Sequence, residues 1–449
     1  MKTDVLIIGG SAAGLVAAMT AKANNPKMDI TIVRKEETVM IPCGIPYIFG
    51  SVKTSNNNIL PDGGLNKLGV NIIIDTVIKI DTNNKMCKTK NDKDIEYSKL
   101  IITTGSIPIM PSWLEGKNLE NVFVIPKEKT YLDEFHKKLD ELNKIVVVGA
   151  GFIGIEVSDE LNKIGKDVTV IEILPRILGL AFDDILAKEA EECLINRGVK
   201  VNIGIGVKKI LGNNKVEGVL LNNGEIIKAD CVILSLGYKP EVTLSKEAGL
   251  KINEYGFIEV DQYRRTSEKD IFAAGDCSEK RDFSTGKLSK TMLASTACAE
   301  ARVAAMNLFK LSTVKTFRGT IGIYFTAIGD TAFGVAGLNK GQAEKEGFEV
   351  VAGSFKGIDR HPGKLDDSHS QMVKLIVSKE NGVILGGEVI GGKSAGELTN
   401  AIGFIIQNNM TINDLILSQI GTHPMLTASP AGYPLIKAAE IVAKTLRDN

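Results

Sequence analysis

The sequence predicts an α/β protein with two Rossmann-like domains and a smaller α+β domain at its C-terminal end. Two stretches, beginning at Val5 and Lys144, have the order strand, glycine-rich turn, helix, strand, which is typical of Rossmann-like units. After about residue 320 the pattern changes to two strands around an Asn381-Gly382 turn, which predicts a β-hairpin. A chain of 449 residues is too long for one ordinary core, so two or three domains also agree with its length.

The first unit has an irregular glycine turn. We expect strand, turn, helix and strand over residues 5–33, with the turn at residues 9–14. The turn is GGSAAG, so serine replaces the second glycine of GxGxxG. Arg34 lies 25 residues after Gly9 (34 − 9 = 25), near the place where a ribose-binding carboxylate is expected. The spacing alone does not distinguish a dinucleotide site from a simple packing turn.

The second unit has the cleaner motif. GAGFIG, residues 149–154, follows a strand and opens a helix, and such glycines let the backbone approach a pyrophosphate at a helix N-terminus. Glu172 lies 23 residues after Gly149 (172 − 149 = 23), close to the spacing of about 20 expected of a carboxylate that binds an adenosine ribose. A carboxylate there repels a 2′-phosphate, so the sequence favours NADH over NADPH. The alternative is a packing turn with a solvent-facing glutamate.

Three further segments mark the domain organisation. LIITTGSIPIMP at residues 100–111 is a strand whose glycine and prolines mark a crossing into the second domain, which we expect to end near CVILSLGYKPE at residues 231–241. IFAAGDCSE at residues 271–279 is another apolar strand ended by a glycine and an aspartate. A helix over about residues 395–407 follows the hairpin, with apolar residues on one face.

The composition excludes some classes of protein. Lysine plus arginine equals aspartate plus glutamate at 54 each, which argues against nucleic acid bound through a bulk positive field. The six cysteines are scattered without a CxxC, as expected of a reducing compartment, and the four histidines do not cluster with them, so we expect no metal site.

An apolar run near the N-terminus imitates a signal peptide. VLIIGGSAAGLVAAMTA at residues 5–21 is uncharged, but Asp4 and the Gly9-Gly10 pair interrupt the pattern, and the same residues fit a strand, a turn and a helix. No other segment approaches the length that spans a bilayer. We therefore expect a soluble, cytoplasmic protein without membrane contact.

Cys43 stands in a stiff frame, MIPCGIPYIFG. It follows the second strand of the first unit, near the carboxyl edge of the sheet, where ligands of doubly wound folds bind. If the next residues begin a helix, its dipole lowers the pKa of the thiol and favours the reactive thiolate. Pro42 and Pro46 restrict the backbone. The alternative, a buried structural cysteine, stays open, and we assign Cys87, Cys193, Cys231 and Cys298 to that structural class.

The two units, GDC after an apolar strand, and Cys43 in PCGIPY together resemble the pyridine nucleotide-disulfide reductase family. The match is to its single-cysteine branch, which holds coenzyme A-disulfide reductases, NADH oxidases, NADH peroxidases and polysulfide or persulfide reductases. The resemblance covers essentially the whole chain and implies a homodimer. It implies an FAD domain at residues 1–112 and 241–320, an inserted NADH domain at 113–240, and a dimerisation domain at 321–449.

The resemblance also implies which residues contact the two cofactors. FAD is expected at Gly9, Ser11, Ala12, Gly14, Arg34, Lys35, Thr103, Thr104, Gly105, Gly275 and Asp276. NADH is expected at Gly149, Gly151, Phe152, Ile153, Gly154, Glu156, Glu172 and Gly237. Phe152 falls where this branch often has an aromatic gate over the flavin, and Glu156 matches the family's acid in the nicotinamide region.

By the same resemblance, Cys43 lies against the flavin and cycles between thiolate and a sulfenic acid or mixed disulfide. The absence of CxxxxC excludes an internal redox disulfide. Ile420 to Pro434 lacks the Tyr-Ala-Pro-Pro motif of coenzyme A-disulfide reductases. His423 to Ala428 instead resembles the HPTxSE motif of two-cysteine reductases, with Ala428 in place of glutamate. We therefore expect either that His423 of the partner subunit protonates the leaving group at Cys43, or that His423 caps a loop.

The expected activity is FAD-dependent reduction by NADH of a small disulfide, polysulfide or persulfide through Cys43. The alternatives are an NADH oxidase or peroxidase that uses dioxygen or peroxide, and a flavoprotein redox sensor or electron carrier.

Overall fold

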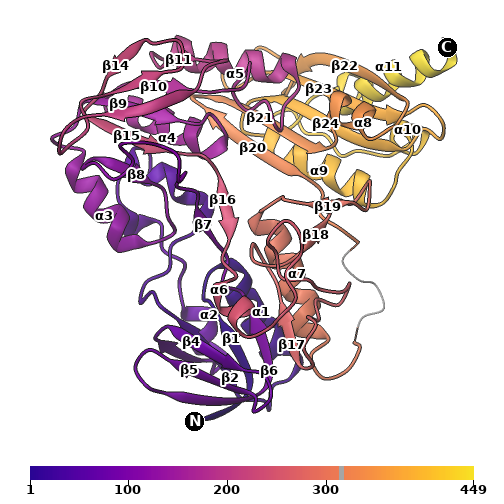
Figure 1. The fold of residues 1–449 in the computed structure, drawn as a ribbon. Coiled ribbons are helices and arrows are strands. Elements are labelled where there is room, and N and C mark those ends of the chain that lie inside the picture. The colour runs from indigo at the N-terminus through magenta and orange to yellow at the C-terminus, as the bar shows by residue number, and fades with distance from the viewer. Residues whose placement is uncertain (313–317, 449) are drawn as a thin grey trace.

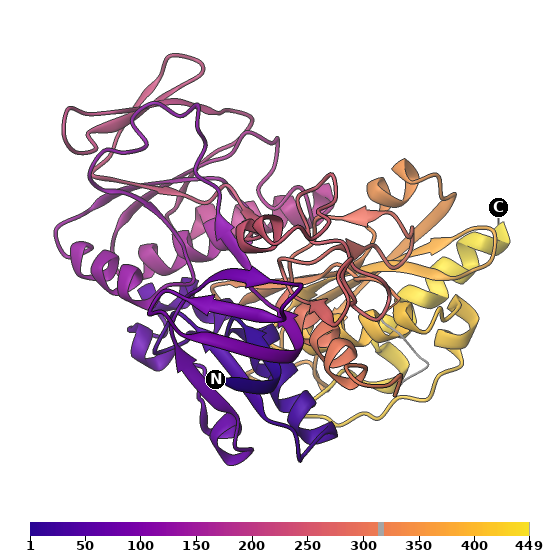
Figure 2. The same cartoon turned by 60° about the horizontal axis from the view of Figure 1, so that its bottom comes forward.

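The computed structural model describes residues 1–312 and 318–448 and has three parts. Figure 1 shows the first part at the bottom, the second at the upper left and the third at the upper right. From below, the indigo first part lies in front, with the magenta second part to its upper left and the yellow C-terminal part to its right (Figure 2). Within the described residues, no helix has the length and apolar character needed to cross a membrane.

The first part is built on a mainly parallel sheet in the order β3-β2-β1-β6, extended by the antiparallel pair β5-β4. A later strand, β17, joins β6 in parallel, so the chain returns to this sheet after the second part. The strands are β1 (Lys2–Ile8), β2 (Ile30–Arg34), β3 (Asn71–Ile74), β4 (Val77–Asp81), β5 (Met86–Thr89), β6 (Asp94–Ile102) and β17 (Ile271–Ala273).

Two alanine-rich helices, α1 (Ala12–Asn24) and α7 (Ala294–Met306), stand side by side on this sheet (Figure 1). Their buried alanines, among them Ala17 and Ala301, have no bulk to hold the helices apart. The smaller elements of this part are α2 (Gly63–Lys67), α6 (Thr243–Glu247), β18 (Lys280–Arg281) and β19 (Leu288–Ser289). Between β2 and β3 the chain also forms the 3-10 helices η1 (Pro42–Gly44), η2 (Pro46–Phe49) and η3 (Ser55–Asn57), and η2 and η3 pack against helices of the second part.

The second part repeats the design with a parallel sheet in the order β11-β10-β9-β15-β8. Its strands are β8 (Val122–Val124), β9 (Lys144–Val148), β10 (Asp167–Ile171), β11 (Lys200–Asn202) and β15 (Cys231–Leu234), with helices α3 (Lys129–Lys138), α4 (Phe152–Lys163) and α5 (Asp184–Asn196). A small antiparallel sheet holds β12 (Val207–Leu211), β13 (Gly218–Leu221) and β14 (Ile226–Lys228). The antiparallel pair β7 (Ser106–Pro108) and β16 (Tyr238–Pro240) connects the first and second parts (Figure 1).

The third part is an antiparallel sheet in the order β20-β21-β24-β23-β22. The predicted hairpin is confirmed as β23 and β24, and the helix after it as α9, whose Leu398, Ile402 and Ile405 are buried. Its elements are β20 (Ile323–Ile328), β21 (Thr331–Gly337), β22 (Val350–Ile358), β23 (Ser370–Ser378), β24 (Ile384–Gly391), α8 (Lys340–Lys345), α9 (Ala395–Gln407), α10 (Ile412–Ile416), η4 (Pro430–Gly432) and α11 (Pro434–Asp448).

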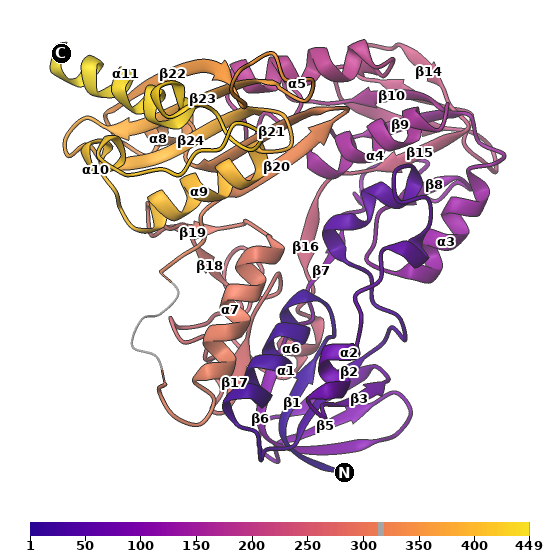
Figure 3. The same cartoon turned by 180° about the vertical axis from the view of Figure 1, so that it is seen from behind.

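The view from behind shows where the second and third parts meet: α4 lies next to β20 (Figure 3). The structure confirms the predicted α/β class, with two Rossmann-like sheets and a C-terminal α+β part. It also brings the carboxyl ends of the two parallel sheets to one central space, which positions the candidate site.

Candidate functional site

One cavity of about 2300 Å³ extends across all three parts. This volume exceeds the roughly 300–1,000 Å³ of an ordinary small-molecule pocket, so there is room for more than one ligand. Most of the residues expected to contact cofactors line it: Ser11, Ala12, Thr103, Gly105, Gly149, Gly151, Phe152, Ile153, Glu156, Glu172, Gly237, Gly275 and Asp276. Cys43 lines the same cavity. Gly9, Gly14, Arg34, Lys35, Thr104, Gly154 and His423 are not among its lining residues.

The glycines of the two loops have different physical roles. A Cβ on Gly9 would lie 2.3 Å from the Thr103 carbonyl oxygen, and one on Gly14 would lie 1.9 Å from that of Gly9, so the protein's own packing requires both glycines. A Cβ on Gly151 would meet nothing within 4 Å. Gly151 therefore leaves open space where its backbone faces the cavity, as the approach of a pyrophosphate requires.

Ser11 occupies the place of Gly151 in the first loop. Both residues are the N-caps of their helices, and neither N-terminus is capped by a side chain of the N-cap residue. Unpaired N–H groups and the positive end of the helix dipole thus face the cavity from two sides. The residues present fit two anionic dinucleotides, and the Ser11 hydroxyl adds a donor of its own.

Glu172 lies at the end of β10 and is only 8% exposed, which speaks against the solvent-facing alternative. Its Oε2 accepts a hydrogen bond of 2.7 Å from the Ala150 N–H, and its Oε1 accepts one of 2.8 Å from the Leu174 N–H. These bonds fix the carboxylate beside the glycine loop. Each oxygen keeps a lone pair that could accept from a ribose hydroxyl.

Arg34 and Lys35 are engaged by other parts of the protein. Arg34 is buried, and its two terminal nitrogens donate hydrogen bonds of 2.6 Å to Asp62. A Cβ on Gly10 would lie 2.4 Å from Arg34 Cδ, so the arginine stem covers the glycine turn. Lys35 pairs with Glu128 at 2.6 Å. The charged ends of both residues therefore bind carboxylates of the chain.

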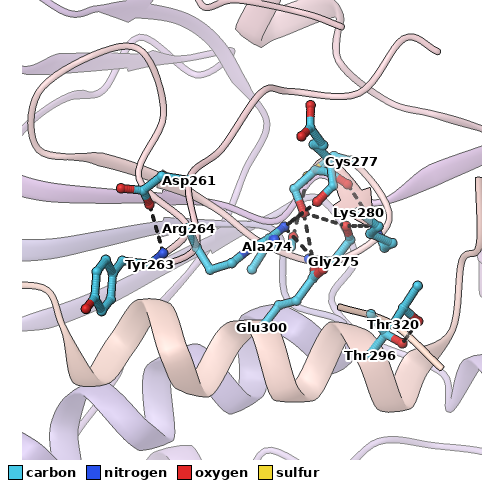
Figure 4. A network of polar contacts seen from close by, with 12 residues as sticks. Asp261, Tyr263, Arg264, Ala274, Gly275, Cys277, Lys280, Thr296, Glu300 and Thr320 are labelled. Carbon is cyan, nitrogen blue, oxygen red and sulfur yellow. Dashed lines mark hydrogen bonds and ion pairs between the residues drawn. The ribbon is translucent and has the colours of Figure 1, made fainter. Parts of the chain in front are cut away.

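The turn at Gly275 rests on a buried polar network (Figure 4). Glu300 Oε2 accepts a hydrogen bond of 2.8 Å from the Gly275 N–H, and Arg264 pairs with Glu300 Oε1 at 3.2 Å. Lys280, itself buried, donates a hydrogen bond of 2.7 Å to the Gly275 carbonyl oxygen. Sequence reasoning missed these three charged residues because no local motif distinguishes them. Together they hold Gly275 in the left-handed region at φ +84°.

Asp276 presents its carboxylate to the cavity next to a cation that the sequence analysis also missed. Its Oδ2 accepts hydrogen bonds of 2.8 Å from Lys127 Nζ and from Ser106 Oγ. Burial by itself raises the pKa of Asp276, but Lys127, together with Lys280 and the Ser106 hydrogen bond, holds that pKa below its usual value. Lys127 also lies 5.6 Å from the centre of the Tyr238 ring.

Cys43 is a free thiol on η1 that opens onto the cavity. Burial raises the pKa of the thiol, Glu156 raises it further, and Lys127 opposes both. This corrects the expectation of a lowered pKa. Cys43 lies within one 3-10 helix of three residues and is followed by another of four, and both are too short to provide the dipole of a full helix.

Glu156 lies where the three parts of the chain meet. Glu156 lies on α4. Thr326 Oγ1 of β20 donates a hydrogen bond of 2.9 Å to Glu156 Oε1. Tyr47 of η2 is the second side chain that hydrogen-bonds to Glu156. Burial raises the pKa of Glu156 to about 7, although both hydrogen-bond partners act in the opposite direction. The cavity therefore contains a carboxyl group that gains or loses its proton near neutral pH, and the Cys43 thiol lines the same cavity.

Phe152 stacks on a residue of the third part. Its ring lies 5.2 Å from the Tyr324 ring with an angle of 13° between the planes, and it meets Phe182 edge-on at 5.6 Å. Tyr324 is in turn held by a hydrogen bond of 3.3 Å from its hydroxyl to Thr291 Oγ1. Phe152 of α4, the predicted gate, thus packs between aromatic rings of the second and third parts.

His423 lies in an exposed loop of the third part and does not join the cavity of its own chain. The Met425 N–H donates a hydrogen bond of 3.2 Å to His423 Nδ1, which is the loop-capping contact of the alternative interpretation. The same loop exposes large apolar side chains: Leu417 is 84% exposed and Leu426 65%. Within the residues described, no group of three or more histidine, cysteine or acidic side chains could hold a metal ion.

Comparison with known proteins agrees with this geometry. The family model described as pyridine nucleotide-disulphide oxidoreductase matches residues 3–301, and the model of its dimerisation domain matches residues 323–431. An NADH oxidase of Methanocaldococcus jannaschii is 32% identical over 457 residues, covering 98% of this chain and 99% of the relative.

Two sulfur-reducing proteins are similar over comparable lengths. The NAD(P)H coenzyme A polysulfide/persulfide reductase of Pyrococcus horikoshii is 30% identical over 98% of this chain and 99% of its own. Among solved structures, an NAD-dependent persulfide reductase from A. fulgidus superposes with a TM-score of 0.91 at 30% identity, covering 100% of this chain and 84% of that one.

Proposed function

The chain belongs to the pyridine nucleotide-disulphide oxidoreductase family, and from that premise we propose that it reduces a small disulfide, polysulfide or persulfide through Cys43. It is an oxidoreductase whose cofactors are FAD and NAD(P)H. The observation that carries the proposal is the exposed Cys43 thiol in the cavity that both glycine loops share. The names of the Pyrococcus horikoshii relative and of the A. fulgidus structure support a sulfur acceptor.

In this proposal the first loop and its surroundings hold FAD, and the second loop holds NADH. Ser11, Gly105 and Asp276 would bind the first dinucleotide, and Gly151 and Glu172 the second. When bound, FAD accepts a hydride from NADH and gives two electrons to a sulfur acceptor. The buried network behind Gly275 would keep the Asp276 carboxylate in place for this binding.

The chain's own residues then manage the sulfur and the proton. The Cys43 thiolate attacks one sulfur of R–S–S–R, the S–S bond breaks, and RS⁻ leaves and takes up a proton. Two electrons then cleave the mixed disulfide, which restores the Cys43 thiolate and releases the second RS⁻, and this RS⁻ also takes up a proton. The sum is NADH + H⁺ + R–S–S–R → NAD⁺ + 2 RSH, so each turnover takes up one proton. Lys127 favours the thiolate because its charge opposes the effects of burial and Glu156.

We place His423 of the partner subunit near Cys43 as the acid for the leaving group. The dimerisation-domain match supports a homodimer, and the exposed Leu417 and Leu426 beside His423 suit a protein contact. We further propose a cytoplasmic protein, because all six cysteines are free.

A second candidate function is NADH oxidase. The Methanocaldococcus jannaschii relative carries that name, and a thiolate beside a flavin can also be oxidised by peroxide to a sulfenic acid. The choice between the two acceptors depends on whether turnover requires thiol–disulfide exchange between Cys43 and a sulfur substrate.

Anaerobic titration with NADH of the purified protein carrying FAD tests the proposal. We expect the as-isolated protein to need two equivalents of NADH per FAD, because Cys43 stores an oxidised sulfur species. The Cys43→Ser variant should need one equivalent, and its turnover with coenzyme A disulfide or polysulfide should fall by about 10⁴-fold or more. If the variant kept its sulfur turnover, Cys43 would not be the redox thiol. If it lost sulfur turnover but consumed NADH with dioxygen at the wild-type rate, a direct flavin oxidase activity would exist beside the thiol reaction.

A further inference from the structure

A buried ion cluster joins the third sheet to the N-terminus of α5. Lys374 of β23 contacts Asp183 and lies 3.2 Å from Glu388 Oε2 of β24. The Glu388 side chain is completely buried, and the Lys374 side chain is 11% exposed. One lysine thus lies between two carboxylates at the boundary between the second and third parts.

The cluster holds Asp183 by its backbone as well as by its side chain. The Asp183 N–H donates a hydrogen bond of 3.1 Å to Glu388 Oε1. Asp183 is also the N-cap of α5, and its Oδ1 accepts hydrogen bonds of 3.0 Å from the Ile185 and Leu186 N–H groups. A shift of this one residue would therefore move the start of α5 and the segment before it.

That segment, residues 173–183, borders the cavity on the side of Glu172. Several of its residues line the cavity: Ile173, Leu174, Leu178, Gly179, Leu180 and Ala181. On one side the Leu178 N–H donates a hydrogen bond of 2.8 Å to the Ala150 carbonyl oxygen of the glycine loop. On the other, Gln342 Nε2 of α8 donates one of 3.0 Å to the Leu180 carbonyl oxygen.

We propose that Lys374, Asp183 and Glu388 are positioning residues for the pyridine nucleotide, which fix the 173–183 segment against the third sheet and thereby set the affinity for NADH. The inference rests on the proposed placement of NADH at the second glycine loop. It gives the third part a role within a single subunit in addition to any contact with a partner.

The physical reason is the charge balance of the cluster. Without Lys374, two carboxylates would face each other in a buried place with no cation, and breaking a buried pair by removing one partner is strongly destabilising. Burial already raises the pKa of Glu388, and Lys374 opposes that effect. Repulsion between the carboxylates is relieved most easily by moving Asp183, because it lies at the end of a cavity-lining segment whereas Glu388 lies inside a sheet.

The test is the Lys374→Met variant, with Lys379→Met as the matched control. Lys379 follows β23 directly and is exposed. In anaerobic stopped-flow reduction by NADH, we expect Lys374→Met to raise the apparent Kd for NADH about tenfold while the limiting rate changes by less than about twofold. Hydrogen exchange of residues 173–183, measured without NADH, should become faster in this variant and not in the control.

If Lys374→Met folds poorly, Glu388→Gln is a second variant for the same test, because the glutamine amide keeps the shape of the carboxylate. The double variant Lys374→Met with Glu388→Gln removes both opposing charges and should recover part of the lost affinity. An unchanged Kd with unchanged exchange in the 173–183 segment would overturn the proposal. So would a joint fall of the limiting rate and the thermal midpoint with faster exchange throughout the third sheet. Because reduction of the flavin by NADH does not require Cys43, a failure of the thiol mechanism would leave this result unaffected.

Discussion

Glu156 raises the pKa of the Cys43 thiol, although the two residues follow strands of different Rossmann-like sheets. The carboxyl stands on α4 of the second part and the thiol on η1 of the first, and both line the central cavity. Because the pKa of Glu156 is itself raised to about 7, its charge changes around neutral pH. The protonation of the Cys43 thiol therefore depends on the charge of Glu156, which belongs to the second part.

The first prediction follows from this coupling. Glu156→Gln removes a negative charge near Cys43, so the thiol should ionise at lower pH than in the wild type. The measurement is the rate of iodoacetamide alkylation of Cys43 against pH, with the modified cysteine identified by mass spectrometry. Glu189→Gln, on the exposed face of α5, is the control. An unchanged midpoint in Glu156→Gln would show that Glu156 does not act on the thiol.

Glu156 should also make stability depend on pH. Its pKa is higher in the folded protein than the usual 4.5, so the folded state binds the proton more tightly than the unfolded state. The contribution is fully present below pH 4.5 and is lost as pH rises to about 7, a change of about 3 kcal/mol. Chemical unfolding at pH 5 and pH 8 should show a larger loss in the wild type than in Glu156→Gln. Equal losses in the two proteins would contradict the prediction.

The parts of this site that could be predicted from sequence depend on local backbone geometry. The glycine loops were found because Gly9 and Gly14 pack against carbonyl oxygens, a constraint that leaves a short motif in the chain. Cys43 was found because its prolines and its place after a strand are local too. Lys127, Thr326 and Tyr324 left no such motif, because their roles come from contacts across parts of the chain.

The same distinction explains why the lowered pKa, which was expected only if a helix began after Cys43, does not occur. Local reasoning considered a helix dipole after the thiol, whereas the two short 3-10 helices contribute little and burial and Glu156 raise its pKa. In the third part, the hairpin of β23 and β24 was predicted from its Asn381-Gly382 turn. β20 and β21 were not predicted, although β20 brings Thr326 and Tyr324 to the cavity.

A further prediction concerns the choice of nucleotide. Glu172→Ala combined with Ile173→Arg should reverse the preference from NADH to NADPH, because the first change removes a repelling carboxylate and the second adds a partner for a 2′-phosphate. Ile173 is 68% exposed and lines the cavity, so an arginine fits there without disturbing the core. The ratio of kcat/KM for the two nucleotides should shift toward NADPH by at least about 100-fold. Ile173→Arg alone, with Glu172 kept, should shift it much less.

The network behind Gly275 should be required for FAD retention. Glu300→Ala leaves Arg264 buried without its carboxylate partner, with hydrogen bonds only to Ser278 and Glu279, and leaves the Gly275 N–H without an acceptor, which should cost about 3–5 kcal/mol. The variant should unfold at lower temperature and be purified with less FAD per chain. Glu247→Gln, an exposed change on α6, should do neither. Full FAD content together with an unchanged thermal midpoint in Glu300→Ala would refute the supporting role.

The last prediction separates the two interpretations of His423. If His423 of the partner subunit donates the proton to the leaving thiolate, His423→Gln should lower turnover with a disulfide by about 10²-fold or more and flatten its pH profile. Reduction of the flavin by NADH should stay at the wild-type rate, because that half-reaction needs no leaving thiolate. If His423 only caps its loop through Met425, glutamine can replace it with little loss, and turnover and pH profile should stay the same. His136→Gln on α3 is the control for a histidine outside the exposed loop, and sedimentation of both variants shows whether the dimer is intact.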